Sequence, residues 1–195
     1  MRNAEQVKSL FDDFCINGNM QSYDELYRLL CAGLIHFSAS VVGSFHLAEE
    51  IVSDVFIMLW QKRTQLTAVN HPRMYIYICV RNSSLNALPG SQKSGIPFDG
   101  LDTDALSVVP DIEQRLIFSE VSQIVEGAIR ELPSRCQLIF RLIKIDGLTY
   151  KETASLLDIS PKTVDAQLAI AIKRLAHSIR MHMPEYLLAS YLQES

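Results

Sequence analysis

The chain has 195 residues, of which 48% are hydrophobic and 21% charged, and its formal net charge is −4. This hydrophobic content is sufficient for a packed core and argues against an intrinsically disordered chain. No apolar run approaches the roughly 20 residues that cross a bilayer, and charges are scattered through the N-terminal stretch, which lacks a signal core. The sequence therefore predicts a folded, cytoplasmic protein without membrane insertion.

Residue types that carry catalysis or bind metals are present but form no recognisable site. The cysteines are widely spaced and contain no C-x-x-C pair, and the five histidines lack metal-binding spacing. Glycine-rich phosphate loops and the G-x-S-x-G nucleophile motif are also missing. We therefore expect no catalytic, cofactor-binding or metal-binding residue, and no enzymatic activity.

Residues 1–88 have the periodicity of helices. Apolar residues recur at steps of three and four in two segments, at Leu26, Leu29, Leu30, Leu34 and Phe37, and at Ile51, Val55, Met58 and Leu59. A further helix is expected to begin near Pro72, because proline is favoured in a first helical turn. Its buried stripe is predicted to contain Met74, Ile78 and Leu85. β-Branched and aromatic residues in this segment also allow a strand, but its length and neighbours favour a helix.

Residues 88–110 have no clear periodicity and contain three of the seven prolines and three of the eight glycines. This composition is typical of an exposed linker, and so long an irregular segment is unusual inside a compact domain. We therefore predict an all-α protein with two small helical domains, residues 1–88 and 111–195, joined by a flexible linker at 89–110.

The two halves differ in charge. Residues 1–129 contain nine Lys and Arg against fifteen Asp and Glu, which gives −6, whereas residues 130–182 contain nine against five, which gives +4. The basic excess therefore lies in the C-terminal half, where a polyanionic partner would bind.

Two capped helices are predicted within this basic region. Thr149 followed by Glu152 forms a capping box, and Ser160 with Pro161 is a typical helix start. Gly147 lies where a left-handed C-cap would end the preceding helix. The second of the two capped helices is expected to run from Pro161 to about residue 179, with Val164, Leu168 and Ile172 facing inward.

This layout is that of a helix-turn-helix, whose second helix enters the major groove. Glutamine suits adenine, threonine a thymine methyl, and aspartate the amino group of cytosine, whereas lysine and arginine suit phosphates. A helical hairpin that packs only against protein remains the alternative. The candidate DNA-binding residues here are Lys162, Thr163, Asp165, Ala166, Gln167, Lys173 and Arg174, with Arg141 as a further phosphate contact.

Three segments resemble a known family. The stretch ELPSRCQLIFRLIKIDGLTYKETASLLDISPKTVDAQLAIAIKRL resembles region 4 of bacterial RNA polymerase sigma factors of the extracytoplasmic-function (ECF) group. AEEIVSDVFIMLWQKR, residues 48–63, resembles the region 2 helix that docks on the polymerase clamp. HPRMYIYICVRNSSLNAL, residues 71–88, resembles the promoter-melting segment that follows. Because a helix-turn-helix occurs in many regulators, the region 2 segment makes the match specific.

The resemblance implies a division of labour between the halves. The N-terminal domain would bind core RNA polymerase and capture bases of the downstream promoter element, and the C-terminal domain would recognise the upstream element of promoter DNA. The polymerase-binding candidates are Glu50, Asp54, Phe56 and Trp60, with core packing an equal alternative for the two aromatic residues. An anti-sigma factor is a further candidate partner.

Downstream DNA contacts are implied for a small set of cations, namely Lys62, Arg63, Arg73 and Arg81. The family usually continues into a strongly basic segment, but here only Lys93 follows. Two other functions therefore remain open. One is a LuxR-like transcriptional regulator with a ligand-sensing N-terminal half, and the other is a sigma-like interaction module without strong DNA binding.

Overall fold

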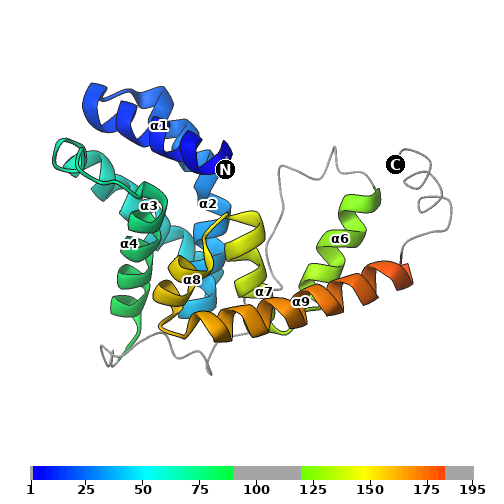
Figure 1. Cartoon of the computed structure of the whole chain (residues 1–195). Coiled ribbons are helices and arrows are strands. Elements are labelled where there is room, and N and C mark those ends of the chain that lie inside the picture. The colour runs from blue at the N-terminus through cyan, green and yellow to red at the C-terminus, as the bar shows by residue number, and fades with distance from the viewer. Residues whose placement is uncertain (1, 90–119, 183–195) are drawn as a thin grey trace, which may run out of the picture.

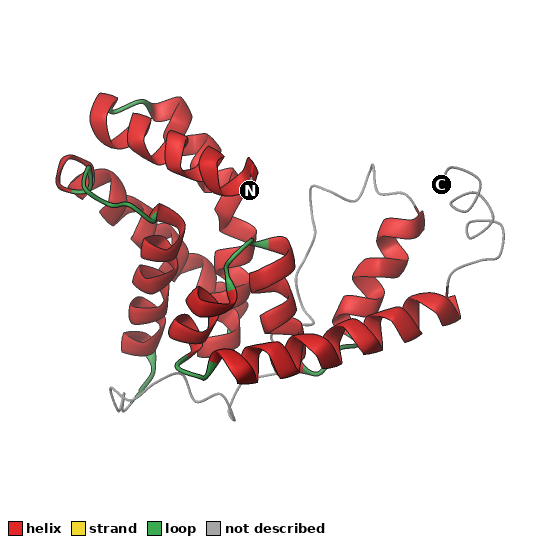
Figure 2. Ribbon diagram, viewed as in Figure 1, coloured by secondary structure: helices red, strands yellow, loops and turns green. Residues whose placement is uncertain are grey.

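The structure is a computed structural model that describes residues 2–89 and 120–182. These residues form helices and connecting loops and contain no strand, which confirms the predicted all-α class (Figure 2). The predicted linker, residues 89–110, lies outside the described residues except for its first position.

The N-terminal half consists of four α-helices and one short 3-10 turn. Each boundary follows from local chemistry: Asn19 accepts hydrogen bonds from the backbone N–H groups at the start of α2, and Ser44 does so for α3. Between them, Gly43 adopts φ 69°, the left-handed conformation that ends a helix. The elements are α1 Arg2–Asn17, α2 Met20–Val42, α3 Phe45–Lys62, η1 Arg63–Gln65 and α4 Pro72–Ala87.

Helix α2 is the centre of this half and contacts α1, α3 and α4. Its length and composition would allow a membrane span, but 44% of its apolar window is buried inside the protein. Leu26, Leu34 and Phe37 are fully enclosed by the surrounding helices. The apolar character of α2 is therefore explained by its position in the core.

The C-terminal half, as far as residue 182, is arranged around the long helix α9. Helix α9 runs beside α8 and α7 and reaches α6 (Figure 1). Against α6 and α7 it buries Ala171 and Leu175 in a small separate cluster with Ile129 and Leu132. The elements are α6 Glu120–Arg130, α7 Ser134–Phe140, the π-helical turn η3 Arg141–Ile145, α8 Tyr150–Leu157 and α9 Pro161–His182.

The two halves share one hydrophobic core. Leu138 and Leu142, from α7 and η3, belong to the same buried cluster as Phe37 of α2 and Ile76 of α4. Helix α8 lies against α4, and η3 lies against α2 (Figure 1). The C-terminal half is therefore packed onto the N-terminal half through α7, η3 and α8.

Two predicted inward positions are wrong. Ile78 of α4 is 39% exposed and Ile172 of α9 is 47% exposed. In α9 the buried residues follow steps of four, three and four from Val164, which places Ala171 inward and Ile172 beyond the edge of the stripe. Helix α4 packs against both α2 and α8, so its core face is wider than the predicted stripe. The buried residues of α4 are Pro72, Arg73, Ile76, Tyr77, Val80 and Ser84.

We predict that Leu142→Ala lowers the free energy of unfolding by about 2–5 kcal/mol, because Leu142 is fully buried in the shared core. Ile145→Ala, in the same turn but exposed, should cost about 1 kcal/mol or less. Urea denaturation would measure both, and a shared core predicts one cooperative transition. Two separate transitions, or equal costs for the two variants, would contradict the shared core.

Candidate nucleic-acid and protein interfaces

The α8–α9 pair has the geometry predicted from its capping residues. The hydroxyl of Thr149 accepts the backbone N–H of Glu152 at 3.2 Å, and the Glu152 carboxylate accepts the backbone N–H of Thr149 at 2.8 Å. Asp158 ends α8 at φ 56°, a left-handed conformation that aspartate tolerates better than most residues. The hydroxyl of Ser160 then accepts the backbone N–H of Thr163 at 3.0 Å and starts α9.

Packing fixes the angle between these two helices. The backbone N–H of Ile159 reaches the carbonyl of Ala154 at 3.0 Å and closes the turn. Ala154 and Leu157 of α8 and Val164 and Leu168 of α9 are buried between them. The arrangement is a helix-turn-helix, with the N-terminal turns of its second helix at the surface.

The exposed face of α9 contains Lys162, Asp165, Ala166 and Lys173, as the sequence predicted. It also contains Ala169 and Ile170, which the sequence analysis missed. The helical periodicity of α9 could have predicted them, since they lie between the buried residues Leu168 and Ala171. Small and apolar side chains here suit contacts with thymine methyl groups.

Thr163 and Gln167 are less available than predicted, because both are partly buried. The Thr163 hydroxyl is hydrogen-bonded to the Ser160 hydroxyl at 2.8 Å. The amide oxygen of Gln167 accepts a hydrogen bond from the Cys136 thiol of α7 at 3.1 Å. The face that meets solvent is therefore centred on Asp165 and Ala166 rather than on Gln167.

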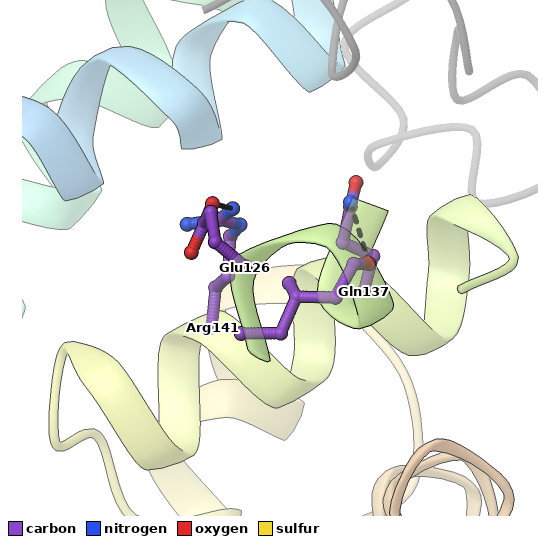
Figure 3. Close-up of polar contacts among 4 residues, drawn as sticks. Glu126, Gln137 and Arg141 are labelled. Carbon is purple, nitrogen blue, oxygen red and sulfur yellow. Dashed lines mark hydrogen bonds and ion pairs between the residues drawn. The ribbon is translucent and has the colours of Figure 1, made fainter. Parts of the chain in front are cut away.

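Arg141 has a structural partner. Its guanidinium forms an ion pair with Glu126 of α6, and nearby the Gln137 side chain donates to the carbonyl of Ile129 at 2.9 Å (Figure 3). These two contacts tie α6 to α7 and η3. Arg141 is thus mostly enclosed by protein, whereas Lys173 and Arg174 are exposed cations of α9.

Helix α3 presents an acidic surface with an apolar residue beside it. Glu50 and Asp54 are both exposed, one turn apart. Ile57, which the sequence analysis did not single out as an interface residue, follows them and is 54% exposed. Exposed carboxylates around an apolar contact point suit a basic protein partner.

The two aromatic candidates on α3 differ in position. Phe56 is 2% exposed and packs edge-on against Tyr23 and Tyr27, so it is a core residue in this arrangement. Trp60 is only partly buried: it stacks on Phe14, and the Arg63 guanidinium lies 4.7 Å from its ring centroid.

The N-terminal cations differ in exposure. Lys62 is exposed, whereas Arg63 and Arg81 are partly buried. Arg73 is only 9% exposed and lies against Gly147 of the C-terminal half. In this arrangement, Arg73 of α4 is therefore covered by protein.

Cysteine and metal chemistry find no support in residues 2–89 and 120–182. All four cysteines are free thiols, and no cluster of metal-ligating side chains occurs in these ranges. Burial raises the pKa of the Cys15 thiol to about 11, which keeps it protonated and unreactive at neutral pH.

Comparison with known proteins assigns both halves. The family model for Sigma-70 region 2 matches residues 22–93, and that for Sigma-70 region 4 matches residues 122–175. The chain is a sigma factor of the ECF type. As an ECF sigma factor it binds core RNA polymerase and promoter DNA and directs transcription initiation. The region 2 match over the N-terminal half disfavours the LuxR-like alternative.

Similar proteins cover nearly the whole sigma factor. It is 21% identical over 184 residues to the ECF RNA polymerase sigma-E factor of Escherichia coli K12, covering 89% of this chain and 96% of that one. It is 21% identical over 159 residues to the ECF RNA polymerase sigma factor SigM of Bacillus subtilis 168, covering 78% and 91%. A solved structure of CnrH in complex with the cytosolic domain of CnrY aligns with a TM-score of 0.49 at 13% identity, covering 90% and 99%.

We predict that Ser160→Ala lowers the free energy of unfolding by about 1 kcal/mol, because the first turn of α9 loses its N-cap. Ser160→Gly should cost only a few tenths, since glycine leaves the cap open to water. The matched control is Ser155→Ala, at an exposed position in α8. Thermal denaturation would compare the three variants, and equal melting temperatures would show that the Ser160 hydroxyl does not stabilise α9.

Proposed function

We propose that the exposed acidic face of α3 docks on core RNA polymerase, that α4 engages melted downstream DNA, and that the N-terminal turns of α9 read the upstream element. The observation that carries this proposal is the presence of both surfaces in one chain: an acidic face on α3 and a capped helix-turn-helix with exposed cations. A protein surface rich in carboxylates repels DNA, so the first suits polymerase and the second suits the promoter.

The polymerase contact is assigned to Glu50, Asp54 and Ile57. Their side chains are exposed, so they need no rearrangement to meet a partner. Trp60 flanks them and is held by Phe14 and Arg63, which makes it a rigid edge of the surface. Phe56 lies on the buried side of α3, where it packs against Tyr23 and Tyr27.

We predict that Asp54→Arg weakens binding to core polymerase several-fold and slows association, because it reverses a charge at the centre of the acidic face. Glu5→Arg makes the same charge change on the exposed surface of α1 and should leave binding unchanged. Interferometry with immobilised core polymerase would measure both. Equal weakening by the two variants would mean that net charge, and not the α3 face, drives the contact.

Upstream recognition is assigned to the exposed face of α9. Asp165 and Ala166 face solvent in the turns that helix-turn-helix proteins direct at base edges. Lys162 at the start of the helix, and Lys173 and Arg174 further along it, are exposed and suited to phosphates. Gln167 reaches DNA only if it leaves Cys136, so its part in recognition is secondary to that of Asp165.

We predict that Lys162→Ala weakens transcription from all upstream sequences alike and lowers the salt slope of binding by about one unit, because one phosphate contact is lost. Asp165→Ala should instead change selectivity at one base position, by about 1–3 kcal/mol. Transcription from a promoter library randomised in the upstream element would show the difference. If both variants lower transcription equally from every promoter in the library, α9 binds DNA without sequence specificity.

The remaining parts of the proposal follow from this role. The sigma factor acts in the cytoplasm, where polymerase and promoter are found, and has no enzymatic activity of its own. Residues 1–88 and 111–195 act as two domains, with 89–110 as the linker. An anti-sigma factor is a candidate partner. A competition experiment would test whether it and polymerase bind the same acidic face of α3.

A further inference from the structure

A groove lies between α6 and α9 in the C-terminal half. It consists of two adjoining hollows with volumes of about 260 and 520 Å³, which share Ala128, Glu131 and Ser178. The first hollow extends to His182 at the end of α9, and the second extends to Ile170 in the middle of that helix. Because an α-helix rises about 1.5 Å per residue, these two ends of the groove are about 18 Å apart along α9.

The α6 side of the groove is apolar and open. Gly127 of α6 lines it, and a Cβ added there would meet no atom of the described residues within 4 Å. Glycine costs a helix interior about 1 kcal/mol relative to alanine, and no described side chain fills the space that it leaves. Ile124 beside it is only partly buried, and Ile170 of α9 is 42% exposed. The groove therefore offers apolar surface and space for a further segment.

The α9 side of the groove carries positive charge. Lys173 and Arg174 line the larger hollow, and neither forms an ion pair within residues 2–89 and 120–182. The one carboxylate among the described lining residues, that of Glu131, accepts a hydrogen bond from the Ser178 hydroxyl at 2.7 Å. An occupant that complements this groove therefore combines apolar side chains with carboxylates.

The sequence of residues 183–195 has this combination, and the segment continues from the end of α9 where the groove begins. It contains two glutamates, Glu185 and Glu194, and no lysine or arginine. Its apolar residues recur at steps that would place them on one face of a helix. They are Leu187, Leu188, Tyr191 and Leu192. A helix of this length would span about 20 Å, which matches the length of the groove.

We propose that residues 183–195 fold back along α9 and occupy the groove between α6 and α9. A return of this length brings Glu194 to the level of Lys173 and Arg174, while the apolar face of the segment meets the open space beside Gly127. Docking covers apolar surface of α6 and holds that helix on α9. Any other protein that uses this groove has to displace the segment first. The inference does not depend on the roles proposed for α3, α4 or the first turns of α9.

Site-specific photocrosslinking in the full chain tests this docking. The photoreactive amino acid p-benzoylphenylalanine would replace Ile170, whose side chain lines the groove. The matched control carries it in place of Ile172, which is 47% exposed but does not line the groove. Mass spectrometry would quantify the cross-links to residues 183–195. We expect about ten-fold more of them from position 170 than from position 172, because the docked state is the major one.

Filling the groove should release the segment. Gly127→Leu places its side chain in open space, so it should block the groove without disturbing the packing of α6 on α9. Gly127→Ala is the control, because it makes the same backbone change but adds only a methyl group. We expect Gly127→Leu to lower the cross-link yield from position 170 several-fold and Gly127→Ala to leave it near the wild-type level. Circular dichroism would verify that both variants remain helical.

A charge exchange distinguishes specific docking from chance contact. Glu194→Lys and Lys173→Glu should each lower the cross-link yield from position 170, and the two changes together should restore it. Equal yields from positions 170 and 172, an unchanged yield in Gly127→Leu, or no recovery in the double variant would overturn the proposal. So would cross-links that join two different copies in a mixture of isotopically labelled and unlabelled chains, because the occupant would then be the segment of a second molecule.

Discussion

Burial of α7, η3 and α8 against the N-terminal half, with η3 on α2 and α8 on α4, is the interaction on which the rest of the structure depends. Leu138 and Leu142 complete a core that Phe37 and Ile76 begin, so the helix-turn-helix is attached to the body of the protein by the same apolar contacts that fold the N-terminal half. Burying side chains of this size contributes about 1.5–3 kcal/mol each. The carboxylate of Asp146 adds a polar contact to this attachment, because it accepts a hydrogen bond from the buried Tyr77 hydroxyl of α4.

This constraint determines which surfaces remain available. The acidic face of α3 lies away from the contact and stays exposed, as do Lys162 and Asp165 at the start of α9. Arg73 is covered. In the arrangement observed, the chain therefore exposes the acidic face of α3 and the first turns of α9, the surfaces proposed to contact polymerase and the upstream element, whereas Arg73 of α4 is covered by protein.

Local signals in the sequence predicted the helices and their ends. The capping box at Thr149 and the start of α9 at Ser160 depend on residues within four positions of each other, so no tertiary information was needed. The resemblance to sigma factors predicted that region 2 lies in the N-terminal half and region 4 in the C-terminal half. The exposed acidic residues of α3 were also predictable, because an amphipathic helix separates them from its apolar stripe.

Features that depend on distant contacts escaped prediction. Nothing around Phe56 in the sequence shows that Tyr23 and Tyr27 enclose it. The inward turn of Gln167 depends on Cys136, 31 residues away. The packing of the halves depends on Gly33 and Asp146, more than 100 residues apart, and each has an ordinary local explanation: a glycine in a helix and an aspartate before a turn. Such pairs emerge only when the chain is folded.

A distance measurement between the halves tests the central claim most directly. Spin labels carried by unnatural amino acids at Asn82 of α4 and Ala176 of α9, both exposed, would report the separation by pulsed electron resonance without interference from the native cysteines. A shared core predicts one narrow, short-distance population in the free protein. A broad distribution already present in the free protein would contradict the account, because the two halves would then be moving independently.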